Sequence, residues 1–199
     1  MDLKEKPILR YEDILKDSDE GSKDILRQKS QPFELPLTAD DITHLHTLMA
    51  YLDESLDEEY AEKWNLRAGC GLALPQIGYL KRGFAISTIV NDKPFKVIVV
   101  NPVILSESIE LTYLASGEGC LSVDREVNGY VMRHKRIMVR FQSFDLETNT
   151  LKETTLKMSG MPAIIFQHEY DHLDGILFYD HINPKTPFKP ADGAKELSR

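Results

Sequence analysis

Residues 161–175 read Met-Pro-Ala-Ile-Ile-Phe-Gln-His-Glu-Tyr-Asp-His-Leu-Asp-Gly, and this stretch decides how the fold is interpreted. Pro162 suits the first turn of a helix and Gly175 suits the position after its last turn, so a helix is predicted over 162–174. Because apolar residues stand on both sides of the polar ones, the helix is expected to be buried. Because several strands are predicted between an earlier helix and this one, we expect an α+β fold, with antiparallel or mixed β-sheets packed around this central helix.

The pattern His-Glu-x-x-His inside this helix indicates a metal site. His168 and His172 are four residues apart, so both imidazoles lie on one face of the helix, one turn apart. Two imidazoles so placed can bind one tetrahedral metal ion, and Glu169 lies where it could take a proton from water in the site. A chance match on a charged amphipathic helix is the alternative, but buried His and Glu side chains need partners, which a metal would supply.

A catalytic metal site needs a third protein ligand and an open fourth position. In one class of zinc peptidases a third histidine follows the motif at the position that Phe178 occupies here. The remaining candidates after the motif, which are weaker, are Asp180, His181 and Glu196. The best-suited upstream residue is Cys120, because glycines at 117 and 119 allow close approach and a thiolate is a standard metal ligand. An inert buried thiol is the alternative interpretation of Cys120.

Composition limits the possible functions. The chain has 199 residues, of which 42% are hydrophobic, and a net charge of −8, which suits a single domain over 1–199. The acidic balance argues against coating DNA or an anionic membrane, and the longest apolar stretches are far too short to span a bilayer. Mixed charge at residues 1–6 indicates no secretory signal, so a cytoplasmic location is expected. Two cysteines, Cys70 and Cys120, cannot make a disulfide framework.

The remaining elements follow from periodicity and turn residues. Residues 1–37 are expected to be a surface arm with one short helix, and Thr38 is expected to cap a helix carrying an apolar stripe from Ile42 to Leu56. The acidic residues between Asp53 and Glu62 are interpreted as a solvated face or loop. Strands are predicted over 84–89, 95–100, 103–105, 110–114, 136–142 and 151–158, with a turn over 91–94 and a loose tail over 185–199.

Three segments together resemble the three motifs of peptide deformylases. They are Gly69–Gln76 (Gly-Cys-Gly-Leu-Ala-Leu-Pro-Gln), Glu118–Ser122 (Glu-Gly-Cys-Leu-Ser) and Gln167–Gly175, in this order. The resemblance extends over about 33–183. Extra residues near 53–66 and the absence of a long C-terminal helix resemble the longer form found in Gram-positive bacteria. One departure is Leu74, where the family usually has alanine, and the larger side chain is expected to crowd this turn.

The resemblance implies removal of the formyl group from the N-terminal formyl-methionine of nascent bacterial chains, with possible transient ribosome contact. It implies that Cys120, His168 and His172 bind one divalent metal, with Fe(II) native and nickel, cobalt or zinc able to substitute. Glu169 would accept the proton of the attacking water and pass it to the leaving amine. The side-chain amide of Gln76 and the backbone N–H of Leu121 would hold the developing oxyanion.

The resemblance also suggests supporting and substrate-binding residues. Gln167 and Asp171 would hold the motif in place, although an ion pair between Asp171 and an arginine elsewhere is an equal alternative. An apolar pocket for the methionine side chain would include Met161, Ile164 and Ile165 on the helix, with Cys70 and Gly71 across the cleft. Tyr130 and Arg133 would line the rim. Simple core packing is the alternative for the helix residues.

Two rival functions stay open on the sequence. A zinc peptidase would use the same His-Glu-x-x-His motif but needs a third ligand downstream of it. A non-catalytic deformylase-like protein would keep the fold and the metal as a binding module, and Leu74 is its only sequence hint. Retention of Glu169 argues against this second rival, because a structural metal site needs no general base.

Overall fold

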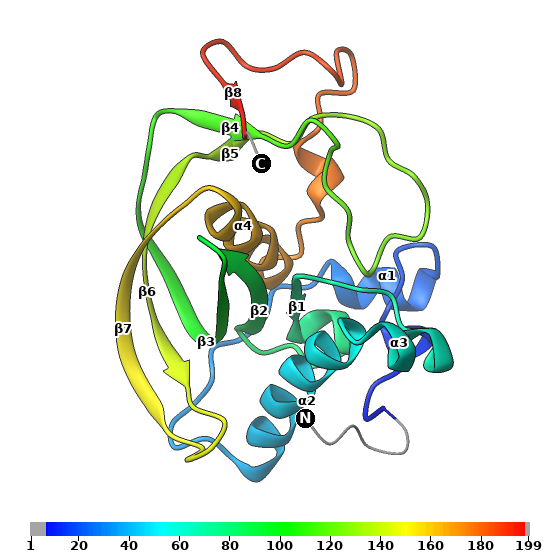
Figure 1. The fold of residues 1–199 in the computed structure, drawn as a ribbon, viewed down its shortest axis with the longest axis vertical. Coiled ribbons are helices and arrows are strands. Elements are labelled where there is room, and N and C mark those ends of the chain that lie inside the picture. The colour runs from blue at the N-terminus through cyan, green and yellow to red at the C-terminus, as the bar shows by residue number, and fades with distance from the viewer. Residues whose placement is uncertain (1–6, 198–199) are drawn as a thin grey trace.

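The computed structural model describes residues 7–197 and shows a mixed α+β fold (Figure 1). The helices are η1 (Tyr11–Asp13), α1 (Glu20–Leu26), α2 (Ala39–Ser55), α3 (Glu58–Trp64), η2 (Leu74–Ile77), α4 (Met161–Leu173) and η3 (Phe178–His181). The strands are β1 (Gly71–Ala73), β2 (Gly83–Val90), β3 (Lys93–Glu107), β4 (Leu111–Tyr113), β5 (Arg133–His134), β6 (Arg136–Phe144), β7 (Leu151–Ser159) and β8 (Lys195–Glu196). The expected α+β class with antiparallel and mixed sheets is therefore confirmed.

The strands form two sheets. Five of them pair antiparallel in the order β1-β2-β3-β6-β7. In the smaller sheet, β4 pairs antiparallel with β5 and parallel with β8. No helix within 7–197 is both long and apolar enough to cross a lipid bilayer.

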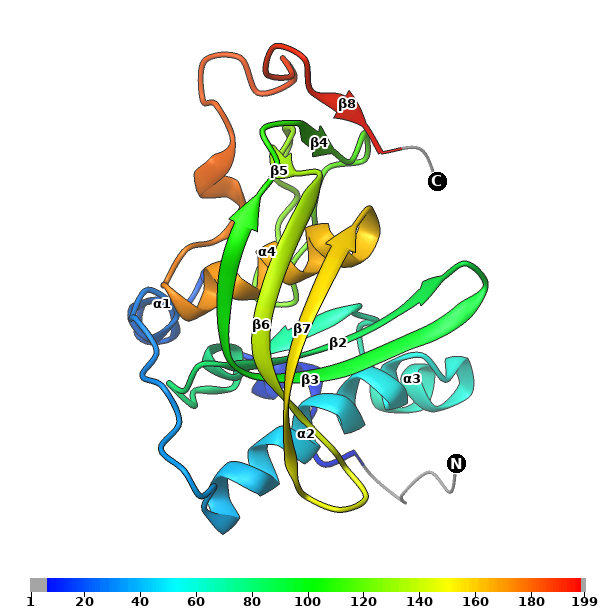
Figure 2. The ribbon, with the colours of Figure 1, turned by 90° about the vertical axis from the view of Figure 1, so that its left-hand side faces the viewer.

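Alternating residues of the large sheet serve two separate cores, because successive side chains of a strand point to opposite faces. Phe84 and Ile86 of β2 belong to a cluster with Phe166 of α4, whereas Ala85 between them belongs to a cluster with Leu48 of α2. The two long helices thus cover opposite faces of the sheet. In Figure 2, α4 crosses β6 and β7, and α2 lies beneath β3.

The start of α2 is confirmed at the expected cap. The Thr38 hydroxyl accepts the N–H of Asp41 at 3.1 Å, and the Asp41 carboxylate accepts the N–H of Thr38 at 2.8 Å. Such a reciprocal cap typically contributes about 1 kcal/mol.

Three predicted segments differ in the structure. The acidic stretch contains helix α3, because Asp57 caps it by accepting the N–H of Tyr60 at 2.9 Å and the buried ring of Tyr60 anchors it to the core. The segments expected at 95–100 and 103–105 are one long strand, β3. The turn before β3 is only Asn91 and Asp92, whose positive φ angles of 49° and 60° suit a two-residue hairpin.

The two expected peripheral segments are more ordered than the sequence suggests. The arm contains η1 and α1, and buries Ile14 and Leu26. The tail returns to the molecule at β8, which pairs with β4, so the expectation of a loose tail is wrong at Lys195 and Glu196. The parts of these predictions that concern residues 1–6 and 198–199 lie outside the described residues.

Candidate metal centre and active-site cavity

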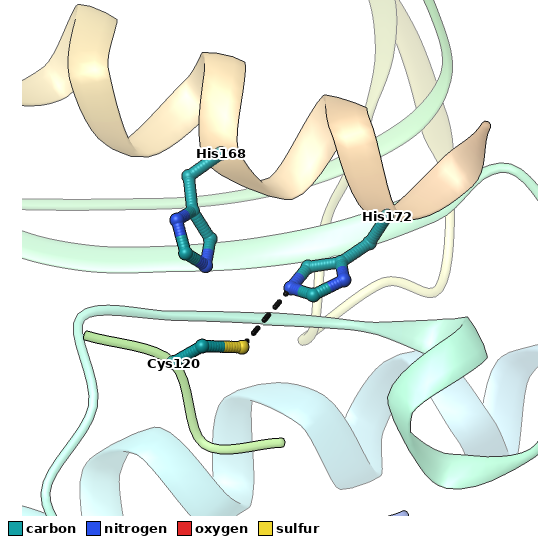
Figure 3. A group of neighbouring side chains, drawn as sticks. All are labelled: Cys120, His168 and His172. Carbon is teal, nitrogen blue, oxygen red and sulfur yellow. Dashed lines mark hydrogen bonds between the residues drawn. The ribbon is translucent and has the colours of Figure 1, made fainter. Parts of the chain in front are cut away.

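Three side chains from two parts of the chain meet beside α4. His168 and His172 lie one turn apart on this helix, and Cys120 lies in the loop between β4 and β5 (Figure 3). Their ligand atoms all lie within 4.8 Å of one another, and Cys120 Sγ is 3.3 Å from His172 Nε2. Donors on a tetrahedral ion with bonds of about 2.0–2.3 Å stand roughly 3.5 Å apart, so these residues fit a metal ion.

The environment of Cys120 favours the thiolate, which is the form that binds metals. Burial alone would raise the pKa of this thiol, but His172 and His168 outweigh burial and lower the pKa to about 5. The backbone N–H of Ser122 lies 3.4 Å from Cys120 Sγ, and the side-chain Nε2 of Gln76 lies 3.5 Å from it. Both donors point at the sulfur and stabilise negative charge on it.

A buried chain of charged groups orients His168. Its Nδ1 bonds to Glu118 at 2.8 Å, which leaves Nε2 for the metal. Arg133 donates to both oxygens of Glu118, at 2.8 and 2.9 Å, and to Asp171 at 2.5 Å. Burial alone would raise the pKa of Glu118, but Arg133 and His168 outweigh burial and lower the pKa to about 2.

These buried charged side chains decide two of the interpretations made from the sequence. The arginine partner considered for Asp171 exists, and it is Arg133. The placement of Arg133 at the cleft rim was wrong, because its side chain is only 3% exposed and lies between two carboxylates beneath the site. Gln167 holds strand β5, since its Oε1 accepts the N–H of His134 at 2.8 Å and its Nε2 donates to the His134 carbonyl at 2.9 Å.

We expect Glu118→Gln to lower the free energy of unfolding by about 3 kcal/mol, because it removes one of the two carboxylates that compensate the buried charge of Arg133. Urea unfolding of the metal-free protein measures this. Glu110→Gln is the matched control, because Glu110 pairs with Arg136 at an exposed position, where water screens the pair and little or no loss is expected. Equal losses in the two variants would contradict the structural role of Glu118.

The stabilisation of the folded protein by Glu118 should depend on pH in a predictable direction. The pKa of Glu118 is lowered from 4.5 to about 2 in the folded protein, so its stabilising effect is complete above pH 4.5. The difference between wild type and Glu118→Gln should therefore narrow as the pH falls from 4.5 towards 2.

Glu169 is buried, and one of its carboxyl oxygens, Oε2, lacks a hydrogen-bond partner among residues 7–197. Burial raises the pKa of this carboxyl group to about 7. The carboxyl group packs against Gly71, where an added Cβ would lie 2.7 Å from Glu169 Cδ. A side chain at position 71 would displace this carboxyl group, so the glycine keeps a potential proton acceptor beside the three candidate ligands.

Gln76 presents its amide group in one orientation. Its Oε1 accepts the N–H of Ala73 at 2.8 Å, and its Nε2 donates to the Ser122 hydroxyl at 3.1 Å. Because Oε1 accepts this hydrogen bond from β1, the NH₂ group at the other end of the amide faces Cys120 and the site.

A cavity of about 220 Å³ opens onto these groups. Its lining includes the expected residues Cys70, Gly71, Gln76, Cys120, Leu121, Met161, Ile164, Ile165, His168 and Glu169. Tyr130 is not among the described residues that line it, because its ring packs between Tyr113 and Phe188, at centroid distances of 4.5 and 5.6 Å. The expected rim position of Tyr130 is therefore corrected.

The lining also includes residues that the sequence analysis missed, among them Arg67 and Leu114. Neither belongs to a spacing pattern, so the sequence contains no signal for them. Leu74 does not crowd the cavity. Its side chain is buried in the cluster under α2, and Gly83 makes room for it, since a Cβ there would lie 2.9 Å from Leu74 Cδ1.

The weaker candidate ligands lie elsewhere. Asp180 pairs with Arg27, His181 bonds to Asp171 at 2.8 Å, and Glu196 is exposed on β8. The three candidate ligands, the buried carboxyl group of Glu169 and the largely apolar cavity define the class of metal-dependent hydrolases.

Comparison with known proteins identifies the family within this class. Residues 11–188 match the model of the polypeptide deformylase family, and the chain belongs to that family. Peptide deformylase 2 of Bacillus anthracis is 44% identical over 193 residues, which cover 96% of this chain and 100% of the relative. Peptide deformylase 2 of Geobacillus stearothermophilus is 47% identical over 175 residues, which cover 87% and 92%. These relatives agree with the Gram-positive form expected from the sequence.

Solved structures agree with the family. A probable peptide deformylase from Synechococcus phage S-SSM7 has a TM-score of 0.61 and 33% identity, covering 85% of this chain and 98% of that one. The peptide deformylase of Thermotoga maritima has a TM-score of 0.60 and 30% identity, covering 86% and 97%. The chain is thus a metalloenzyme that removes the formyl group from N-formyl-methionyl nascent peptides and releases formate. The zinc-peptidase and non-catalytic alternatives are not favoured.

Proposed function

We propose that Cys120, His168 and His172 hold the catalytic metal and that Glu169 is the general base of deformylation. The observation that carries this proposal is the convergence of one sulfur and two ring nitrogens beside a buried carboxyl group. A bound divalent cation would supply Lewis acidity there, polarising the formyl oxygen and making water more acidic. Buried helix α4 is then the central element of the described fold, which acts as one catalytic domain.

In the proposed reaction, Glu169 moves one proton twice. Its carboxylate first takes a proton from the water that attacks the formyl carbon. When the carbon–nitrogen bond breaks, Glu169 delivers this proton to the leaving amine and formate departs. Glu169 suits both steps because burial raises the pKa of its carboxyl group towards the working pH, so that the group can both accept and release a proton.

Two further groups are proposed to stabilise the oxyanion that develops on the formyl oxygen. They are the Nε2 amide of Gln76 and the backbone N–H of Leu121. The hydrogen bond from Ala73 to Gln76 Oε1 supports this role, because it fixes the NH₂ group before substrate arrives. A preorganised donor of this kind typically contributes about 3 kcal/mol to transition-state stabilisation.

The apolar part of the cavity is proposed to take the methionine side chain. Met161, Ile164 and Ile165 supply one wall, and Cys70 and Gly71 lie in the same lining. A related deformylase from Acinetobacter baumannii, 30% identical with a TM-score of 0.61, has been solved with Met-Ala-Ser bound. The same kind of short peptide is the natural probe for this cavity.

The proposal includes Fe(II) as the native metal, with nickel, cobalt or zinc able to replace it. One thiolate and two imidazoles suit several divalent metals, so the ligand set is compatible with iron without selecting it. It also includes a cytoplasmic location and transient ribosome contact, because the substrate is a chain still being synthesised.

Release of formate from formyl-Met-Ala-Ser tests the function and the metal together. Protein purified without oxygen should contain about one iron per chain and release formate. Activity should fall on exposure to air, which oxidises Fe(II), and should return when nickel is loaded. No formate release in either the iron or the nickel form would overturn the proposal. If cells starved of iron contain a zinc form of the protein that releases formate as fast as the iron form, the assignment of Fe(II) is overturned.

We expect kcat/KM to fall as the pH drops through the pKa of Glu169, because only the carboxylate accepts a proton. That pKa is about 7 in the metal-free protein, and a bound cation favours the carboxylate and lowers it. The acid limb should therefore lie at or below about pH 7, with full activity above it. Initial rates with the nickel form from about pH 5 to about pH 9 measure the limb. An unchanged limb in the residual activity of Glu169→Gln would contradict this assignment.

A further inference from the structure

The N-terminal arm reaches the turn that carries Cys120. Lys16 lies between η1 and α1, and its ammonium group donates to the carbonyl of Leu121 and to the carbonyl of Tyr11, both at 3.0 Å. The same ammonium stands 3.5 Å from the centre of the Tyr11 ring. The next residue, Asp17, donates its N–H to the carbonyl of Ser122 at 2.9 Å. Two adjacent residues of the arm thus hold two adjacent carbonyls of the cysteine turn.

The peptide unit that joins Leu121 to Ser122 connects Lys16 with the sulfur. Its carbonyl end accepts the Lys16 ammonium, and its N–H end, on Ser122, points at Cys120 Sγ at 3.4 Å. A cation on the carbonyl oxygen polarises an amide and strengthens donation by its N–H. Lys16 can therefore stabilise the thiolate without touching it, through one peptide unit that it also fixes in orientation.

The surroundings of Lys16 hold its ammonium in one place. Burial lowers its pKa, and the charged neighbours Asp124, Arg67 and Cys120 have opposing effects. The two carbonyls and the Tyr11 ring replace part of the water that a surface lysine would keep. If the ammonium group only attached the arm, it would not need to bind the peptide unit whose N–H points at the sulfur of Cys120.

We infer that Lys16 is a positioning residue for the metal thiolate, acting on Cys120 through the Leu121–Ser122 peptide unit. This inference rests on the proposed function, because it assumes that Cys120 is a metal ligand. It assigns the N-terminal arm a part in tuning the metal site. The reacting atoms are not contacted by Lys16, so its effect should appear first in the metal–sulfur bond.

The test compares Lys16→Met, Lys16→Arg and Lys23→Met in the cobalt-loaded full chain. Lys16→Met keeps most of the apolar stem of the side chain and removes the ammonium group, and Lys16→Arg keeps a charged donor. Lys23 is an exposed lysine of α1 that serves as the control. Two readouts are used: the thiolate-to-cobalt charge-transfer absorption and the rate of cobalt loss to a chelator. Lys16→Met should shift the absorption and speed cobalt loss by about tenfold or more, as expected when a partner of a metal ligand is removed. Lys16→Arg should restore most of both, and Lys23→Met should match wild type.

The outcomes separate this inference from the proposed function. If wild type shows no thiolate-to-cobalt absorption, Cys120 is not a ligand and the proposed metal site fails. If wild type shows the absorption and Lys16→Met has the same spectrum and the same rate of cobalt loss, the inference is overturned. If near-ultraviolet circular dichroism shows that Lys16→Met does not fold, Lys16→Gln takes its place, and an unchanged rate in that variant overturns the inference equally.

Discussion

Replacing Glu169 with glutamine should lower kcat for formyl-Met-Ala-Ser by about 10²- to 10⁴-fold, while the metal stays bound. The amide has nearly the same shape as the carboxyl group but cannot accept the proton of the attacking water. The three candidate ligands are untouched, so the metal content should equal that of wild type. Formate release and metal analysis on the same preparation measure both halves of this prediction.

The stability of this variant gives a second, independent readout. The wild-type carboxyl group is buried, has a raised pKa and leaves Oε2 without a partner among the described residues. A neutral amide removes the cost of burying that charge, so Tm should not fall and a small rise is expected. Glu153→Gln, on the exposed part of β7, is the matched control and should leave kcat unchanged. Activity of Glu169→Gln within a few-fold of wild type would refute the assignment of the general base.

The two histidines and Glu169 could be predicted from the sequence because a helix fixes their geometry locally. Four residues make one turn, so the spacing of His168 and His172 already places both rings on one face. The role of Gln76 could be predicted only from the resemblance to a family. Cys120 was already a candidate ligand from its glycine-flanked position, but only the resemblance favoured it over an inert thiol, since no local rule brings a loop cysteine to a helix. The large strands followed from alternation, and the cap at Thr38 followed from hydrogen bonding within a single turn.

The contacts that support the site could not be predicted, because they join distant parts of the chain through long, flexible side chains. Lys16 reaches Leu121 across 105 positions, and Arg133 reaches Asp171 across 38. Arg133 was expected at the rim because it follows the cysteine segment in the sequence. Arg133 is buried instead, because two carboxylates offset its desolvation. Helix α3 was not predicted because its exposed residues are mostly acidic and Tyr60 is its one buried residue.

The two cysteines should differ sharply in their effect on the metal. Cys120 belongs to the group of three candidate ligands, and the histidines lower its pKa to about 5. Cys70 lies exposed in the cavity lining, outside that group, and desolvation there, together with the charge of Glu169, raises the pKa of its thiol. At neutral pH, Cys120 is therefore the thiolate and Cys70 stays a thiol. Cys120→Ser should lose the metal, while Cys70→Ser should keep it.

Removing the hydrogen-bond partner of a metal ligand typically lowers metal affinity by about 10- to 100-fold, and removing the ligand itself should lower it further. Metal loss to a chelator should therefore be more than about 100-fold faster in Cys120→Ser than in wild type. Formate release should fall in proportion to the metal lost. Cys70→Ser is the matched control, because it makes the same substitution in the same cavity; its metal loss should equal that of wild type and its KM should change by no more than a few-fold. Equal metal loss from both variants would mean that the site uses two sulfurs, and retention of metal by Cys120→Ser would mean that the two histidines bind it with another partner.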